Sequence, residues 1–439
     1  MLTLLTSDQC IQQDDAEDKH RQIRQMDSIY ISAELTLIAA AGDDPSFGLP
    51  GVSKNRKMRH RDATVGDMRV SYVPPTVHSA ITYSRWFTRG WTFQEGYLAR
   101  RRLYFTDSAV LFVCNQSQEY EGFQRCAHES DAYLLSGTLN SQAIRATSAS
   151  GVTEVMRLIE RYSARILSYD HDALNAIFGV LNYHHAMVPP INTLWGIPYL
   201  SKPVGKYIIC INWARGGTAT RRLGYPSWSP LGWDGSVLFT GVWQQFELSD
   251  KDAGNIFNRP RDGLESGDLE ENSRYLQITV KIQRFRLVNI APTLPPRTWD
   301  GNYAEYERPY LVIPIGGATG EHADTKLYLP LCWDASPSDD YDSAGLLCAV
   351  TYDTDLDGLS LMVLQDHNTH YERIGFAVVN SETYVMKGSE FSESTSTTQC
   401  IQSLRAYDIR DLYWTLLKGD RKDGLAWIHE IEPVTITLG

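Results

Sequence analysis

Residues 89–95, with the sequence RGWTFQE, place an indole and a carboxylate close together. Trp91 precedes Glu95 by one helical turn, so a helix would present both side chains on one face. The indole could then stack on a base or a nicotinamide, while Glu95 stabilises an oxocarbenium-like centre, as carboxylates do in glycosidic cleavage. The alternative interpretation is structural: Trp91 belongs to the core, and Glu95 pairs with Arg89 or Arg100 at the surface.

The elements around this stretch indicate an α/β region. Residues 35–41 form a continuous apolar run, which predicts a strand buried on both faces, as in a parallel sheet. Residues 42–80 predict a long loop, and ligands in open α/β sheets bind at the carboxyl ends of strands. Residues 102–106 and 110–114 predict a hairpin. A helix with one buried stripe precedes the apolar run, and its stripe is Ile23, Met26, Tyr30 and Ala33.

The rest of the chain changes character twice. Apolar residues at helical spacing predict two helices after residue 150, the second capped by Asp170. Beyond residue 189, short β-branched and aromatic runs alternate with turn residues, which is typical of an all-β region. We therefore expect an α/β region over residues 1–118, a helical connector over 119–190 and a β-rich domain over 191–439. The apolar positions of the first helix are Val155, Leu158, Ile159, Tyr162 and Ile166. The five clearest strands are residues 207–211, 275–280, 310–315, 361–364 and 376–379.

Other chemically suggestive groups have plainer explanations. Residues 316–320 are glycine-rich, but Glu321 follows where a phosphate loop would carry lysine, so a turn is favoured. The spacing of His367 and His370 does not fit a zinc-protease motif, and no metal site is expected. His184 and its neighbour His185 end a predicted helix and are expected to be a capping or surface pair.

Two further groups are interpreted in the same way. Residues 226–229, with the sequence PSWS, lack the flanking glycines of a nucleophile elbow. The run Arg100-Arg101-Arg102 is expected to be a solvated strand edge, with contact to an anionic ligand as the less favoured alternative.

Composition excludes several classes of protein. The net charge is −12 over 439 residues, which argues against nucleic-acid binding because counterion release needs clustered basic residues. No apolar run approaches the roughly 18–20 residues that span a bilayer, and the N-terminus does not fit a signal peptide. The seven cysteines are odd in number and scattered, which fits a reducing, cytoplasmic setting.

Five short blocks, in their order and spacing, resemble the fungal heterokaryon incompatibility (HET) domain over about residues 5–115. The blocks are Cys10–Gln13, Met26–Tyr30, Ala33–Ala40, Gly48–Val52 and Arg89–Glu95. Residues 169–176 and 225–229 resemble stretches that often follow this domain. The family normally opens with a Ser-Tyr-x-Trp-Gly-like strand that this sequence lacks. The resemblance therefore implies an N-terminally truncated, partial HET domain over residues 1–118.

The resemblance implies allorecognition and programmed cell death in filamentous fungi, or related innate-immune signalling. HET domains are remotely similar to TIR domains, which have a flavodoxin-like α/β fold and in some cases cleave NAD. On that comparison Glu95 is the candidate catalytic residue, and Trp91, Arg89, Cys10 and Gln13 are candidate substrate-binding residues. NAD would be a substrate, with no cofactor and no metal. The favoured function is association with protein partners, including homotypic oligomers, and the alternative is a TIR-like NAD glycohydrolase.

Overall fold

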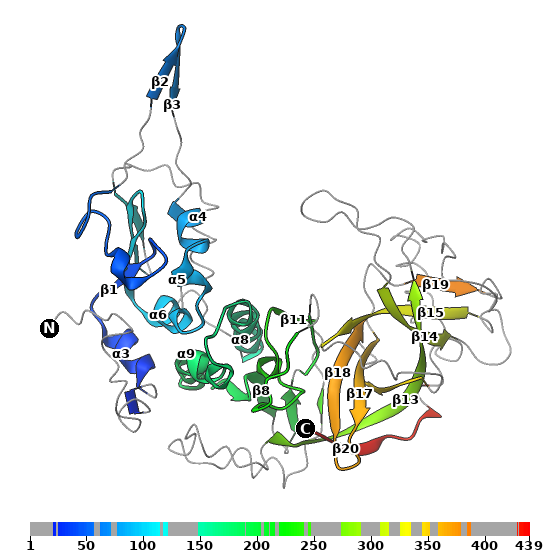
Figure 1. Cartoon of the computed structure of the whole chain (residues 1–439). Coiled ribbons are helices and arrows are strands. Elements are labelled where there is room, and N and C mark those ends of the chain that lie inside the picture. Colours follow the sequence, from blue (N-terminus) through cyan, green and yellow to red (C-terminus); the bar gives the residue numbers. More distant parts are fainter. Residues whose placement is uncertain are drawn as a thin grey trace. The chain divides into compact units, whose positions relative to one another are not determined.

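The computed structural model divides the chain into two compact units, residues 1–198 and 199–439 (Figure 1). No helix of the described part is long and apolar enough to cross a membrane. The residues that the structure describes are 21–22, 25–56, 62–71, 77–114, 117–121, 148–188, 190–202, 206–209, 211–215, 219–240, 245–246, 274–290, 308–315, 325–334, 345–351, 359–378, 384–387, 428 and 430–439.

The first unit combines helices and strands, which confirms the mixed character expected there. Its helical segments are α3 (Met26–Ser32), η1 (Pro45–Phe47), α4 (Val77–Thr82), α5 (Arg85–Thr88), α6 (Thr92–Leu98), α8 (Ser148–Ser163), η2 (Asp170–Asp172) and α9 (Asn175–His185). Its strands are β1 (Thr36–Ala39), β2 (Asp62–Val65), β3 (Met68–Ser71), β4 (Arg101–Phe105), β5 (Val110–Cys114), β6 (Gln118–Tyr120) and β7 (Asn192–Leu194).

A four-stranded sheet in the order β1-β4-β5-β6 forms the centre of this unit. The β4–β5 pair confirms the predicted hairpin, whereas β1 and β4 are parallel. Helices α4 and α5 lie along the sheet (Figure 1) and bury Ile81 and Trp86 against Ile38 and Tyr104. The prediction that β1 is buried on both faces is wrong. Its pattern alternates, with Ala39 exposed, because the apolar core packs against one face of the strand. The TIR- or flavodoxin-like arrangement stays a prediction.

The expected long loop over residues 42–80 contains regular structure. Strands β2 and β3 pair antiparallel as a hairpin, and α4 occupies the end of the segment. The prediction of a long loop is therefore wrong in part. Gly66 in the hairpin turn has a φ of 62°, a conformation that glycine adopts without strain.

Helices α8 and α9 carry the apolar faces predicted for them. Val155, Leu158 and Ile159 of α8 are fully buried, whereas Ile166 lies beyond the end of the helix and is 69% exposed. The predicted cap of α9 is wrong, because Asp170 belongs to the short turn η2. Leu174 occupies the N-cap position of α9 and makes no side-chain capping bond. Helices α3, α6 and α9 pack against one another.

The second unit is built from strands, as predicted. The strands are β8 (Ile197–Lys202, which crosses the boundary), β9 (Lys206–Ile209), β10 (Trp213–Arg215), β11 (Val237–Phe239), β12 (Gln245–Phe246), β13 (Leu276–Ile290), β14 (Arg308–Ile315), β15 (Thr325–Trp333), β16 (Leu346–Val350), β17 (Ser360–Asp366), β18 (Tyr371–Val378), β19 (Tyr384–Lys387) and β20 (Val434–Leu438). One short turn, η3 (Pro230–Gly232), lies between β10 and β11.

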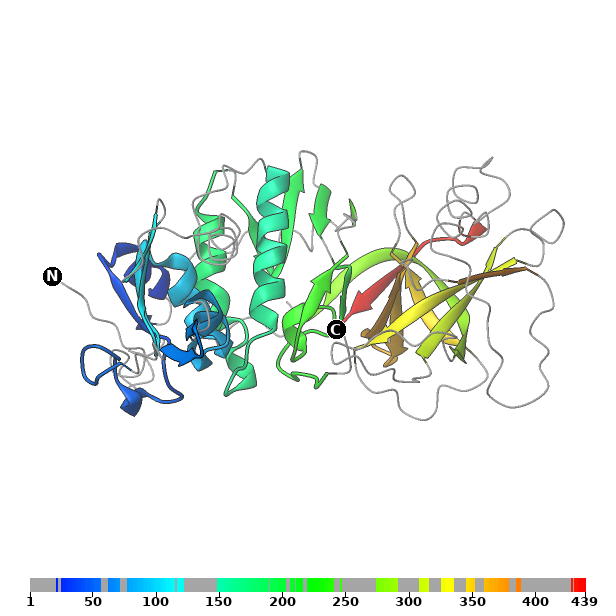
Figure 2. The ribbon, with the colours of Figure 1, turned by 90° about the horizontal axis from the view of Figure 1, so that it is seen from above.

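Eight of these strands form one sheet in the order β16-β17-β18-β20-β13-β14-β15-β19. Additional β16–β13 and β18–β15 pairings close the sheet on itself around an apolar interior that includes Leu311, Leu329 and Leu361. In Figure 2, strands coloured from yellow-green to red cross one another around this interior. The strand segments predicted from sequence overlap β9, β13, β14, β17 and β18, which confirms them.

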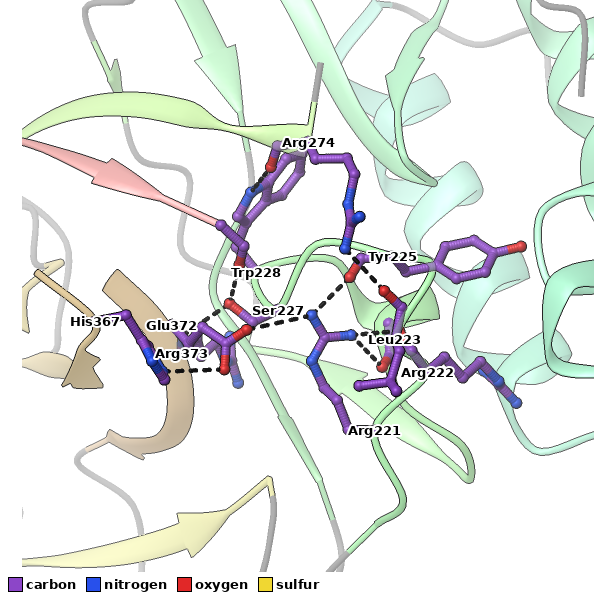
Figure 3. A network of polar contacts seen from close by, with 12 residues as sticks. Arg221, Arg222, Leu223, Tyr225, Ser227, Trp228, Arg274, His367, Glu372 and Arg373 are labelled. Carbon is purple, nitrogen blue, oxygen red and sulfur yellow. Dashed lines mark hydrogen bonds and ion pairs between the residues drawn. The ribbon is translucent and has the colours of Figure 1, made fainter. Parts of the chain in front are cut away.

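A buried ion pair anchors the polar part of the second unit. Arg373 Nε lies 2.7 Å from Asp334 Oδ2, and both side chains are fully buried. The hydroxyl oxygen of Ser227 accepts the backbone N–H of Arg373 at 2.9 Å (Figure 3). Ser227 and Ser229 are themselves fully buried, so the PSWS segment acts in packing.

Candidate functional site around Glu95

The turn between α5 and α6 is fixed by small and hydroxyl-bearing residues. Ser84 caps α5, its hydroxyl oxygen accepting the backbone N–H of Phe87 at 3.1 Å. Thr92 starts α6 and donates its hydroxyl to the carbonyl of Arg89 at 2.8 Å. Gly90 donates its N–H to the Ile166 carbonyl at 2.8 Å, and a Cβ there would lie 2.4 Å from the side chain of Leu167. The sequence RGWT therefore makes a tight turn in which a side chain at position 90 would have to displace Leu167.

Glu95 lies in the first turn of α6, where the helix dipole favours a negative charge. The residue is 8% exposed. Its carboxylate oxygen Oε2 accepts a 3.0 Å hydrogen bond from the indole Nε1 of Trp86. The interpretation of Glu95 as a surface carboxylate is therefore wrong, because α5 folds back over α6 and covers it.

Trp86 and Tyr104 form the aromatic wall beside this carboxylate. Their rings meet edge to face, with centroids 5.5 Å apart and an interplanar angle of 81°. Tyr104 is fully buried, and its hydroxyl has no hydrogen-bond partner within the described part of the chain. Burial raises the pKa of Tyr104, and the charge of Glu95 adds to the rise. The hydroxyl therefore remains protonated at neutral pH.

Arg165 supplies the positive charge of the site. Its guanidinium lies over the rings of Phe87 and Phe93, at 4.5 and 4.8 Å from their centroids. Its Nη1 donates to the Arg89 carbonyl and to the Thr92 hydroxyl, both at 3.1 Å. Burial lowers the pKa of Arg165 to about 10, while Tyr104, Tyr162 and Glu95 oppose that shift. Arg165 thus stays charged at neutral pH in the field of Glu95.

The other predicted site residues take separate positions. Trp91 is half-buried, and its indole Nε1 donates to Asp172 Oδ2 at 3.1 Å. Arg89 is exposed and is linked to the Glu95 site through Arg165. Cys10 and Gln13 lie outside the described residues, as do residues 316–320. The two indoles of this region therefore have different acceptors, Trp86 bonding Glu95 and Trp91 bonding Asp172.

Gln94 fixes α6 to α9 and has no solvent exposure. Its side-chain amide donates to the Asn175 carbonyl at 3.1 Å, and its oxygen accepts the Gly179 N–H at 2.9 Å. Both ends of the amide are satisfied, which is what a buried polar group requires. A Cβ at Gly179 would lie 2.3 Å from the Gln94 oxygen, so glycine permits this contact.

The expectation that His184 lies at the surface is wrong. The residue is 3% exposed and shares a 2.8 Å hydrogen bond with the hydroxyl of Tyr97. Burial lowers the pKa of His184 to about 4, so the imidazole is neutral near pH 7. Helix α9 buries His184 on the face that packs against α6.

The solvated arginine edge also needs correction. Arg102 is fully buried and donates Nη1 to the Gly96 carbonyl, whereas Arg101 is exposed and pairs with Glu34 at 3.2 Å. Side chains alternate between the two faces of a strand, so one arginine of β4 must point inward. Burial lowers the pKa of Arg102.

Together these residues form a desolvated carboxylate beside a cation and an aromatic hydroxyl. Such a group can stabilise developing positive charge, because electrostatic effects are large where water is excluded. Trp86, Tyr104 and Arg165 were not predicted as site residues. Trp86 lies nine residues before Glu95 across a turn, and Arg165 lies seventy residues later, so helical spacing gives no signal for either. In the described part, no group of three potential metal ligands occurs.

Residues 7–95 match the family model described as Heterokaryon incompatibility protein (HET). The match lies within the α/β unit and ends at Glu95, the carboxylate at the centre of the site. Neither the curated proteins nor the solved structures contain a match to the chain.

Proposed function

We propose that the chain acts in heterokaryon-incompatibility-type allorecognition and programmed cell-death signalling in a filamentous fungus, through association with protein partners or further copies of itself. The HET match supports this class of function. A family match alone does not determine an activity, so the mechanism has to be argued from the site.

The burial of Glu95 is the observation that carries the association mechanism. The carboxylate accepts the indole N–H of Trp86, and Arg165 donates to Arg89 and Thr92. These polar groups hold the turn between α5 and α6 together. The motif thus acts as a scaffold in the described part of the unit.

Exposed apolar side chains beside the motif offer a contact surface. Ile166 is 69% exposed, although its backbone pairs with the α5–α6 turn through the Thr88 carbonyl at 2.7 Å. Tyr169, three residues later, is 64% exposed. Burial of these two side chains in a contact would be favourable. We expect partners to bind this edge of the turn.

NAD glycohydrolysis is the second candidate mechanism, favoured by the hydroxyl of Tyr104. This hydroxyl has no partner within the described residues and lies in the field of Glu95. Perturbed buried groups of this kind cluster at catalytic sites. In this mechanism Glu95 stabilises an oxocarbenium-like ribosyl centre, NAD is the substrate, and Trp91, Arg89, Cys10 and Gln13 contribute to binding.

One experiment separates the two mechanisms. The full chain and its Glu95→Gln variant are expressed in a fungal host, and viability and cellular NAD are measured. Glutamine still accepts the Trp86 N–H but carries no charge. The association mechanism predicts equal cell death and unchanged NAD for both chains. NAD loss that disappears in Glu95→Gln would replace it with the enzymatic mechanism.

Association itself is tested by co-purification of two differently tagged copies and of fungal proteins. Ile166→Asp should reduce recovery at least fivefold, because it places a charge in the proposed contact. Val188→Asp is the matched control, since Val188 is 96% exposed and lies after α9. Equal recovery for the two variants would exclude the Ile166 surface.

The cysteines and the net charge bear on the cellular location and on the kind of partner. We propose a cytoplasmic location on the scattered, odd-numbered cysteines, which suit a reducing compartment. The net charge of −12 makes a protein surface a better partner than nucleic acid.

A further inference from the structure

Arg215, at the end of β10 in the second unit, is a buried guanidinium with unused donors. The residue is 6% exposed, and neither its Nε nor its Nη1 has a hydrogen-bond acceptor within the described part of the chain. Burying a charged donor without an acceptor is strongly unfavourable. A ligand that supplied the acceptors would relieve this penalty.

The carboxylates near Arg215 are already engaged. Asp334 bonds Arg373 Nε at 2.7 Å. Asp234 accepts the Thr220 N–H at 2.6 Å. Both carboxylates act on Arg215 through their charge, and their effect opposes the lowering of its pKa to about 10 by burial. Arg215 therefore remains charged at neutral pH without a direct acceptor in the described residues.

Arg222 and Arg373 add positive charge near Arg215, and Arg221 lies, like Arg215, in the field of Asp334. Arg221 donates to the Arg222 and Tyr225 carbonyls, both at 2.6 Å, and lies 4.0 Å from Glu372 (Figure 3). Its Nε has no partner within the described residues.

The charges of the cluster do not balance. Five arginines and three carboxylates interact within the cluster, so the arginines outnumber the carboxylates. The arginines are Arg215, Arg221, Arg222, Arg274 and Arg373, and the carboxylates are Asp234, Asp334 and Glu372.

Gly235 provides access to this charge. It is exposed, has a φ of 76°, and an added Cβ would lie 2.9 Å from Arg215 Nη2. The terminal nitrogen therefore lies directly beneath a surface residue that has no side chain. Ser236, the next residue, is also exposed. A small ligand over this glycine would meet Nη2, whereas Nε and Nη1 are buried.

We propose that Arg215, supported by the positive charge of Arg222 and Arg373, binds a small oxyanion, a carboxylate or a phosphate group, at the surface beneath Gly235. Arginine suits this role because its planar guanidinium presents several N–H donors to such anions. The β-rich unit would then have its own ligand-binding site. It does not depend on the function proposed for the Glu95 region.

The test is a titration of the full chain with inorganic phosphate and, separately, with acetate, each against chloride at constant ionic strength. Calorimetry and the melting temperature Tm are the readouts. We expect saturable binding of at least one anion with a rise in Tm, since a ligand that binds the folded state stabilises it. The two arms distinguish a phosphate group from a carboxylate. Absence of saturable binding in both arms would overturn the proposal.

Variants connect the binding to Arg215. Arg215→Met should weaken binding at least tenfold. The control Arg284→Met removes an exposed arginine of β13 in the same unit and should leave binding unchanged. Unchanged binding in Arg215→Met would remove the site.

A second pair of variants remains informative if Arg215→Met does not fold. Gly235→Asp and Gly235→Asn carry the same backbone strain, because both residues tolerate positive φ, but only aspartate supplies a negative charge. We expect the aspartate variant to have the higher Tm without added anion and to lose the anion response. A Tm no higher than that of Gly235→Asn would contradict the proposal.

Discussion

The indole N–H of Trp86 donates a 3.0 Å hydrogen bond to the carboxylate of Glu95, joining α5 to α6 across the turn at Gly90. Both residues are 8% exposed, so the bond forms where water competes little. The family match ends at Glu95, and the bond places this carboxylate inside the α/β unit. In the described structure the carboxylate of Glu95 thus helps to hold α5 and α6 together.

Trp86→Phe tests this bond. Phenylalanine preserves the contact with Tyr104 but removes the indole donor, leaving a buried carboxylate with one hydrogen bond fewer. We expect a loss of about 1–3 kcal/mol in the free energy of unfolding, measured by urea denaturation. Trp91→Phe is the control, because its bond goes to Asp172 at a half-buried position. A loss for Trp86→Phe no larger than the control would show that the bond contributes little.

Gly179→Ala should lower the free energy of unfolding, although replacing glycine by alanine within a helix normally raises it. Within a helix, alanine is normally about 1 kcal/mol more favourable than glycine. Here the new methyl group would lie 2.3 Å from the Gln94 oxygen and 3.2 Å from the Asp27 backbone nitrogen. We expect a net loss of about 1–3 kcal/mol in urea denaturation, since overpacking forces neighbours apart. Gly224→Ala is the control, because a Cβ there meets nothing within 4 Å. A stabilised Gly179→Ala variant would refute the close contact between α6 and α9.

His184 should make the first unit less stable in acid. Its pKa is about 4 in the folded chain and 6.5 as the reference value, so between these pH values the unfolded chain binds a proton that the folded chain does not. Stability therefore falls as the pH drops from about 6.5 to about 4, by on the order of 3 kcal/mol, and then levels off.

The measurement is urea unfolding across that pH range, comparing wild type with His184→Gln. Glutamine can still bond Tyr97 but does not titrate, so its variant should lose this part of the pH dependence. His185→Gln, which changes the adjacent half-buried histidine, is the matched control. An identical pH profile for wild type and His184→Gln would mean that His184 is not the group responsible.

Arg373→Met should destabilise the chain far more than Arg101→Met, which removes an arginine from an exposed ion pair. It leaves the fully buried Asp334 without the guanidinium 2.7 Å away, and breaking such a pair costs about 3–5 kcal/mol. The double variant Arg373→Met/Asp334→Leu should recover part of the loss, because it removes the buried carboxylate together with its partner. Arg101→Met removes the 3.2 Å contact with Glu34, where both side chains are exposed, and should change stability by less than about 1 kcal/mol. Similar losses for Arg373→Met and Arg101→Met would contradict this account.

Periodicity predicted the elements of the fold because burial of apolar faces is a local signal. Residues 102–114 form the expected hairpin, and α8 buries Val155 and Leu158 as its spacing indicates. The same reasoning failed at polar side chains that are buried by tertiary contacts. Arg102 was assigned to a solvated run, although strand alternation turns it inward. His184 does lie at the end of a helix as predicted, but it is not at the surface, because α9 packs that turn against Tyr97.

The composition of the candidate site was predictable only in part. Glu95 was identified from its motif, but its donor Trp86 belongs to another helix and Arg165 follows α8. Trp91 was placed with Glu95 on the basis of one helical turn. In the structure Trp91 occupies the N-cap position of α6 and bonds Asp172. Sequence spacing cannot report contacts that depend on the packing of separate segments.

The hydrogen bonds of Trp91 and Gln94 constrain where related genes can recombine without loss of stability. The family match stops at residue 95, yet Trp91 and Gln94 make their hydrogen bonds to Asp172, Asn175 and Gly179. A recombination breakpoint just after Glu95 would separate these two side chains from every one of those partners. We therefore expect exchange between related genes to preserve residues 89–95 and α9 as one block. In a chimaera, α9 must come from the same parent as the RGWTFQE turn if the α/β unit is to keep its stability.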